Sequence, residues 1–163
     1  MKNWSRVILG ADHAGFPLKQ QIYRILTGHL RNLVDAIEDF GVHTDAHSVD
    51  YPDIALQVAR AVATLPGSCG ILVCGTGIGM GITANKVPGI RAAVCHNLYT
   101  IQMARQHNNA NVLCLGARVL GEVPDERLEE WLSAWLTTPF EGGRHERRVQ
   151  KIMQAESVVL GKR

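Results

Sequence analysis

The sequence predicts an α/β fold in which a doubly wound, five-stranded parallel sheet is covered by helices. Short apolar segments alternate along the chain with longer amphipathic segments, a pattern typical of successive β–α units. Polar or glycine-rich residues directly follow several of the apolar segments. The 163 residues are most simply one Rossmann-like domain, residues 1–163, with C-terminal helices and a basic helical tail over 144–163.

The first half of the chain begins with a short apolar strand over 7–9 and a glycine-bounded turn. Pro17 then opens a helix that reaches about residue 30, because a proline in the first helical turn loses no hydrogen bond. A second strand is expected within 33–40. Apolar residues three and four positions apart over 54–62 predict the next helix, and Pro66-Gly67 ends it.

The second half continues this alternation and adds two helices at its end. The first of these carries leucine and tryptophan side chains along one side, as expected for a helix packed on a core. The expected elements are a strand over 70–73, a short helix ending near 87–89, a strand over 92–94, a helix over 98–106, a strand over 112–115, a helix over 124–136 and a basic helix from Arg144.

The strongest chemical signal is the segment from Gly70 to Gly81, where a buried strand ends in Cys74 and a glycine-alternating loop follows. Glycines let the backbone turn sharply and bring its N–H groups close to a ligand. If a helix starts near Gly79, its first N–H groups and its dipole favour an anion. A thiol beside such a loop is expected to be partly ionised near neutral pH. A base next to an oxyanion cradle suits proton transfer beside a carbonyl.

Nucleotide-binding loops fit this segment poorly. A Gly-x-Gly-x-x-Gly fingerprint fails because its third glycine would be Met80 or Ile82, and no acidic residue follows at the required distance. Gly-Lys-Ser/Thr is missing as well. Two structural explanations stay open, namely a tight turn with purely structural glycines and a Cys74 that is simply a small core residue.

Further polar residues are expected at the same place. Ligands of such sheets bind beyond the carboxyl ends of the strands, where Asp12-His13 follow the first strand and Arg118 follows the last. His107-Asn108 lie between a helix and the last strand. With Cys74 they would supply an acid, a base and hydrogen-bonding groups at one edge of the sheet. The structural explanations are a helix cap by Asp12 and a helix C-cap in the stretch after His107.

Two more segments have possible ligand chemistry. Arg144 and Arg148 share one helix face and could grip a phosphate dianion, although a solvated helix face would explain them as well. His43 and His47, with Asp45, suggest a metal site. A flexible polar loop explains them better, because no third ligand stands at helical or turn spacing.

Composition excludes several classes of function. A net charge of +2 gives no electrostatic case for nucleic acid or an anionic membrane. No apolar run approaches the roughly 20 residues of a membrane span, and residues 1–6 lack the apolar core of a signal peptide. The four cysteines form no Cys-x-x-Cys pair, so neither a zinc site nor a dithiol centre is expected. We therefore expect a reducing, cytoplasmic location.

Six segments, in order over residues 7 to about 152, resemble the type B ribose-5-phosphate isomerases, a family that includes galactose-6-phosphate isomerase subunits. The matching segments are Gly10–Gly15, Asp50–Asp53, Cys74–Gly79, Ala84–Ala92, Ala104–Asn108 and Glu141–His145.

The resemblance implies that Cys74 carries a proton between C1 and C2 of an open-chain sugar phosphate. His107 would help to open the sugar ring and Thr76 would assist. The amides of the loop residues Gly75, Gly77, Ile78 and Gly79 would hold the enediolate oxygen. Substrate contacts would come from Asp12, His13, Tyr51, Asn108, Arg118, Arg144 and Arg148. The resemblance implies no metal and no organic cofactor, and a homodimer or a dimer of dimers whose active sites are shared between subunits.

Ribose 5-phosphate is the expected substrate. The alternatives are another phosphosugar, such as allose 6-phosphate, galactose 6-phosphate or a tetrulose 4-phosphate, and a non-catalytic phosphosugar-binding subunit. The chain departs from the family pattern at Met80-Gly81, where a serine or similar residue is usual. It also departs in a longer connection over 27–34 and in a histidine- and aspartate-rich loop over 42–49. These departures bear on which sugar fits rather than on the catalytic set.

Overall fold

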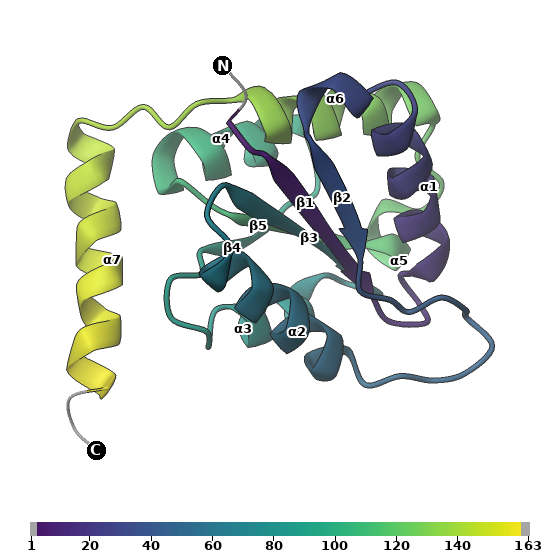
Figure 1. Cartoon of the computed structure of the whole chain (residues 1–163), viewed down its shortest axis with the longest axis horizontal. Helices are drawn as coiled ribbons and strands as arrows, with labels where there is room; N and C mark the ends of the chain where they lie inside the picture. The colour runs from purple at the N-terminus through teal and green to yellow at the C-terminus, as the bar shows by residue number, and fades with distance from the viewer. Residues whose placement is uncertain (1–2, 161–163) are drawn as a thin grey trace.

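Five strands form one parallel sheet in the order β2-β1-β3-β5-β4 (Figure 1). The structure is a computed structural model that describes residues 3–160, and side chains up to residue 156. The predicted α/β class and parallel sheet are confirmed. The strands are β1 (Arg6–Ala11), β2 (Ala36–Asp39), β3 (Ser68–Cys74), β4 (Ala92–Val94) and β5 (Val112–Gly116).

The helices follow the predicted order, with differences at their ends. The first ends at Thr27 rather than near residue 30, because the chain turns at Gly28 into a 3-10 turn over Arg31–Leu33. A helix of four residues, α5, has no periodic apolar pattern and was not predicted. The helices are α1 (Phe16–Thr27), α2 (Tyr51–Thr64), α3 (Ile78–Ala84), α4 (Leu98–Asn108), α5 (Ala117–Leu120), α6 (Asp125–Thr137) and α7 (Arg144–Leu160).

Helices cover both faces of the sheet and bury one apolar core on each. On one face, Ile22 of α1, Ile101 of α4 and Trp135 of α6 are fully buried in the same cluster. On the other face, Val58 of α2 and Met80 of α3 pack on the strands. β3 and β5 are buried along their whole length, which explains why they read as continuous apolar runs rather than as alternating ones.

The connections that leave β1 and β3 diverge at the carboxyl ends of these strands, because β1 leads through α1 to β2 on one side and β3 leads through α3 towards β4 on the other. Such a switch point leaves a crevice in which doubly wound sheets bind their ligands. Asp12 follows β1 there, and Cys74 ends the neighbouring β3. A Cβ atom on Gly15 would lie 2.3 Å from the Val73 carbonyl oxygen, so only glycine lets the start of α1 approach β3 this closely.

The last helix stands apart from the sheet, at one side of the molecule (Figure 1). Its Glu156 carboxylate accepts the Gly89 amide at 3.0 and 3.2 Å, and its Met153 sulfur accepts from Arg91. Residues 161–163 of the predicted tail, and residues 1–2 of the predicted domain, lie outside the described part. Over the described residues, the structure contains no helix of the length and hydropathy needed to cross a bilayer.

Candidate active site

Cys74 lies at the carboxyl end of β3 with its sulfur turned towards the glycine loop. The Gly77 amide donates to Sγ of Cys74 at 3.1 Å. Gly77 itself has a φ of 77°, a left-handed conformation that favours glycine. Cys74 is 4 % exposed, so its sulfur meets the loop rather than bulk water. The thiol is therefore held in one orientation at the switch point.

The other three cysteines are structural. Burial raises the pKa of the Cys69 thiol to about 12 and that of Cys95 to about 11. It also raises the pKa of Cys114. A thiol that stays protonated is neither a base nor a nucleophile at neutral pH. These three side chains pack the core, as the sequence indicated.

Two amides of the loop are already engaged inside it. The Gly77 amide donates to the sulfur, and the Ile78 amide donates to the Thr76 hydroxyl at 3.3 Å. The end of β5 supports the loop from behind, where a Cβ on Gly116 would lie 2.5 Å from the Thr76 backbone. A negatively charged oxygen bound here must share or displace these internal contacts.

Asp12 and His13 follow β1 and lie at the same carboxyl edge of the sheet as Cys74. Asp12 is buried, and its Oδ1 accepts the Gly15 amide at 2.9 Å, so it orders the turn that leads into α1. The Val49 amide donates to Nδ1 of His13 at 3.2 Å. A neutral His13 therefore carries its proton on Nε2, which makes Nε2 a donor that suits a hydroxyl or phosphate oxygen.

Arg118 and Tyr51 lie against glycines of the segment that follows Cys74. The Arg118 amide donates to the Gly75 carbonyl at 2.9 Å, and its guanidinium lies within 3.5 Å of where a Gly75 Cβ would be. The ring of Tyr51 lies against Gly79 in the same way, and a Cβ on Gly79 would lie 2.5 Å from it. Tyr51 and Ile78 are both exposed. The carboxyl edge of the sheet thus brings together most of the predicted site residues.

The structure does not bring His107 and Asn108 to this edge within one chain. α4 starts beyond the carboxyl end of β4 and returns to the opposite edge, where Asn111 pairs with Gly70 at the start of β3. Gly70 and Cys74 are four positions apart along β3, a distance of about 13 Å. The expectation of a single cluster was wrong for one chain, because helices between parallel strands run antiparallel to them. The expected C-cap is confirmed at Asn109, which has a φ of 46°.

A second polar group gathers around the end of α4. The rings of His107 and His145 stack in parallel with centroids 4.1 Å apart. Glu141 Oε2 lies 4.0 Å from Nε2 of His107 and 3.5 Å from Nε2 of His145. Arg144 Nε donates to Nε2 of His145 at 3.3 Å. Burial lowers the pKa of His145, and the nearby positive charges lower it further, Arg148 among them.

Sequence reasoning assigned no role to Glu141 or His145. Their spacing of four residues and their place before two arginines were the available signals. The contact with His107 depends on the return of the chain to the end of α4, where the Glu141 amide donates to the Gln106 carbonyl at 3.1 Å. Tertiary structure alone creates this group.

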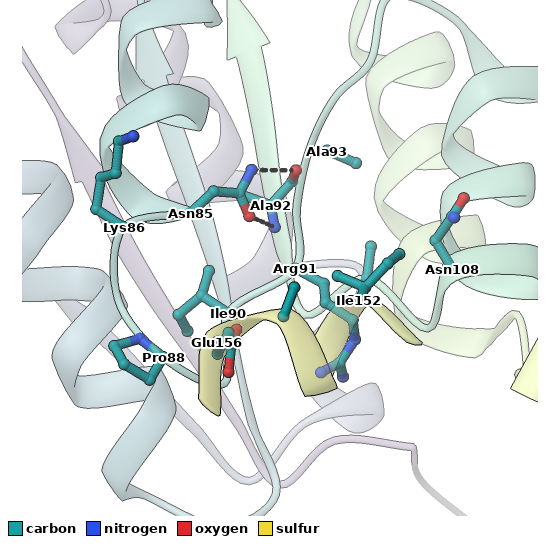
Figure 2. A pocket seen from close by; sticks show the side chains of 12 residues that line it. Asn85, Lys86, Pro88, Ile90, Arg91, Ala92, Ala93, Asn108, Ile152 and Glu156 are labelled. Atoms are coloured by element: carbon teal, nitrogen blue, oxygen red, sulfur yellow. Dashed lines mark hydrogen bonds between the residues drawn. The ribbon is translucent and has the colours of Figure 1, made fainter. Parts of the chain in front are cut away.

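A cavity of about 670 Å³ lies near this second group, between α7 and the segment that leads into β4 (Figure 2). Asn108 and Ile152 line it, as does Arg91. Two hydrogen bonds between the Asn85 side chain and the Ala92 backbone, at 2.8 and 3.0 Å, hold its wall at the edge strand. The cavity shares only Asn108 with the predicted site residues.

A family model described as Ribose/Galactose Isomerase matches residues 7–152. The chain belongs to the Ribose/Galactose Isomerase family. Its resemblance to solved members extends over the whole fold. Ribose-5-phosphate isomerase B of Clostridium thermocellum aligns with a TM-score of 0.85 at 45% identity, covering 94% of this chain and 99% of that one. The type B ribose 5-phosphate isomerase of Trypanosoma brucei aligns with a TM-score of 0.83 at 48% identity, covering 93% and 99%.

Curated relatives in the Ribose/Galactose Isomerase family carry more than one substrate name. The chain is 44% identical over 151 residues to ribose-5-phosphate isomerase B of Escherichia coli, covering 93% of this chain and 96% of the relative. It is also 44% identical over 146 residues to D-erythrulose-4-phosphate isomerase of Pectobacterium atrosepticum, covering 90% and 91%. Equal identity to the two means that overall similarity does not select the sugar.

Proposed function

We propose that this protein is an aldose–ketose isomerase that interconverts ribose 5-phosphate and ribulose 5-phosphate, with Cys74 as the base. The main observation in support is the Cys74 sulfur, fixed by the Gly77 amide at the switch point of the sheet. Membership of a family of sugar-phosphate isomerases gives the chemistry its context.

The proposed reaction moves one proton between two carbons. The Cys74 thiolate removes the C2 proton of the open-chain aldose, and the electron pair forms a C1–C2 double bond while charge moves to O1. The hydroxyl proton of O2 then passes to O1. The thiol returns its proton to C1, and C2 becomes the carbonyl of the ketose. Donors aimed at such a charge contribute roughly 3–4 kcal/mol each to the transition state, which is the role proposed for the loop amides of Gly75 to Gly79 and for Thr76.

We propose that the working unit is a homodimer, or a dimer of dimers, whose active sites combine the two polar groups from different subunits. Ring opening by His107 and phosphate binding by Asn108, Arg144 and Arg148 require these side chains to reach a Cys74 loop. The separation of the two groups within one chain supports a contribution from a second subunit. Exposed apolar side chains on helices that begin at the carboxyl edge favour an interface there, namely Ile78, Ile82, Tyr99 and Val119.

Replacement of Cys74 tests the proposed base. We expect Cys74→Ala to lower kcat by roughly 10²–10⁴-fold, the range that a general base contributes, while the Kd of a linear sugar-phosphate analogue changes little. Cys69→Ala, at the other end of β3, is the matched control. It should keep the native kcat at assay temperatures at which the variant stays folded. In D2O, the fraction of thiol protons that exchange with solvent before they return should appear as deuterium at C1 of the ketose. A near-native rate in Cys74→Ala would contradict the proposal.

A different phosphosugar is the second candidate, because the D-erythrulose-4-phosphate isomerase relative is as similar as the ribose-5-phosphate isomerase. Comparison of kcat/KM for tetrose, pentose and hexose phosphates decides between them. A higher kcat/KM for the tetrose or a hexose phosphate would make that sugar the substrate in place of ribose 5-phosphate, without changing the role of Cys74.

We also propose a cytoplasmic location, which the four free cysteines of this chain favour.

A further inference from the structure

The group formed by His107, Glu141 and His145 has the composition of a transition-metal site. Two imidazoles and one carboxylate are a common protein ligand set for catalytic zinc. One ligand atom from each residue lies within 4.8 Å of the others. We propose that these three side chains bind a divalent ion of the zinc class, and that the bound ion inhibits the isomerase.

His145 provides the fixed ligand of this site. Its side chain is 6 % exposed, and its ring is held between the His107 ring and Arg144. Because Nε2 of His145 accepts the Arg144 donor at 3.3 Å, this nitrogen carries its lone pair and the ring proton sits on Nδ1. An unprotonated nitrogen is the form that a metal ion requires.

The other two ligands have room to close on an ion. The side chains of His107 and Glu141 are 36% and 48% exposed. Zinc at about 2.0–2.1 Å from each ligand atom brings tetrahedral neighbours to roughly 3.3 Å from one another. Glu141 is already 3.5 Å from His145, so most of the movement falls to His107. Its ring must turn out of the parallel stack, because parallel lone pairs do not converge.

Arg144 opposes the ion in two ways. It occupies the Nε2 lone pair of His145, and its positive charge repels a cation at short range. Arg148 adds a second charge near His145. The site should therefore bind zinc more weakly than it would without these arginines. Removal of Arg144 should strengthen binding, an effect that a nonspecific surface site would not show.

Inhibition follows from the position of His107 and rests on the proposed function. An ion held by Nε2 of His107 removes the acid and base that we assign to ring opening. Occupation of the site would thus lower turnover without any change at Cys74.

Zinc affinity, measured on the metal-free full chain by competition with a chromophoric chelator and without substrate, tests the site apart from the isomerase activity. We expect one zinc ion per chain. Glu141→Gln and His145→Gln should each weaken binding by roughly tenfold or more, and Arg144→Gln should tighten it. The exposed Glu141 keeps the test valid if His145→Gln fails to fold. His29→Gln, which removes a histidine paired with Glu129 on the surface, is the matched control and should bind as the native chain does.

Cobalt(II) provides a second readout, because thiolate ligation gives intense sulfur-to-metal charge-transfer bands. We expect a cobalt spectrum without these bands. Equal zinc affinity in Glu141→Gln and the native chain would overturn the proposal, as would a cobalt–thiolate spectrum that is lost in Cys74→Ser.

Discussion

At Gly79 the backbone of α3 passes so close to the ring of Tyr51 that a Cβ atom would lie 2.5 Å from two ring carbons. Glycine at this position is therefore required by the close approach of Tyr51 rather than by helix geometry. Glycine is required for a similar steric reason at Gly15, where a Cβ would lie 2.3 Å from the Val73 carbonyl oxygen. The sequence predicted that the loop glycines bring backbone N–H groups close to a ligand. The structure shows protein side chains close to two of them, Arg118 at Gly75 and Tyr51 at Gly79.

Substitution of Gly79 should act through Tyr51. We expect Gly79→Ala to displace the ring and to raise KM by up to about tenfold, the equivalent of one lost hydrogen bond. Steady-state kinetics of Gly79→Ala, Tyr51→Ala and the double variant measure this coupling. The KM of the double variant should be no higher than that of Tyr51→Ala alone. Strictly additive increases in the logarithm of KM would show that Gly79 acts by another route.

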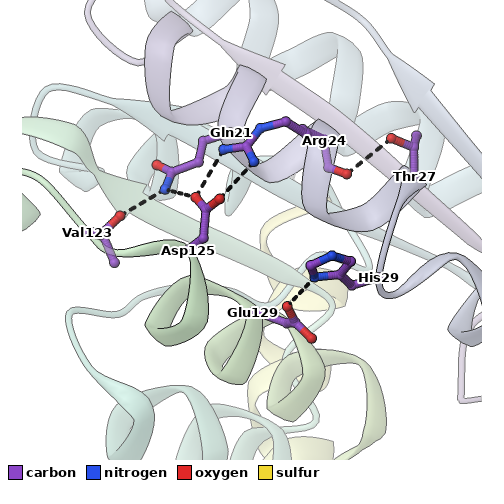
Figure 3. A network of polar contacts seen from close by, with 7 residues as sticks. All are labelled: Gln21, Arg24, Thr27, His29, Val123, Asp125 and Glu129. Carbon is purple, nitrogen blue, oxygen red and sulfur yellow. Dashed lines mark hydrogen bonds and ion pairs between the residues drawn. The ribbon is translucent and has the colours of Figure 1, made fainter.

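Between elements, a polar network joins α1 to the start of α6 on the surface (Figure 3). The Asp125 carboxylate accepts two hydrogen bonds from Arg24, at 2.7 and 3.0 Å, and one from Gln21 at 2.7 Å. The hydrogen bond from Arg24 is the largest cause of the lowered pKa of Asp125, followed by the bond from Gln21. A nearby pair, His29 and Glu129 at 2.7 Å, joins the turn after α1 to the same helix α6.

The contribution of Asp125 to stability should depend on pH with a defined sign. Because its pKa is lower in the folded chain than in the unfolded one, its contribution is full above the unfolded pKa and is lost as pH falls through the folded value. Urea unfolding should show Asp125→Asn less stable than the native chain at pH 7, with the difference shrinking under acid. Asp45→Asn, in an exposed loop, is the control. A difference that grows towards acid would refute the assignment.

Over the whole molecule, the Cys74 loop lies at the carboxyl ends of the strands, whereas the group around His107 lies towards their amino ends. Helix α4 runs from the first end of the sheet to the second. A monomer with this arrangement cannot place His107 beside its own Cys74 without unwinding that helix. Shared sites in a dimer would reconcile the family's chemistry with this geometry. Organisation as a single domain over residues 1–163 stays a prediction.

Mixing two inactive variants tests the shared site. If Cys74 and His107 act from different subunits, a dimer of Cys74→Ala with His107→Ala contains one site with both native residues. Random reassortment should restore about a quarter of native activity, since half the dimers are mixed and each has one competent site of two. Each variant alone, dissociated and reassociated in the same way, is the control. Failure to regain activity despite proven exchange of subunits would exclude the shared site.

The sequence by itself determined the class of the fold, the positions of all five strands, and Cys74 with its glycine loop. These features depend on local chemistry, because apolar periodicity, prolines and glycines act within a few residues of one another. The limits of helices were less predictable, as at Gly28, since tertiary contacts decide where a helix frays or turns.

Only the tertiary structure decided which polar residues meet. Tyr51 lies against Gly79, and Arg118 lies beside Gly75, because the sheet order brings the ends of distant strands together. His145 stacks on His107, while His107 itself is carried away from Cys74 by the return of α4. A sequence pattern names the residue types that a reaction needs, but the direction in which each helix runs across the sheet sets the edge at which they act.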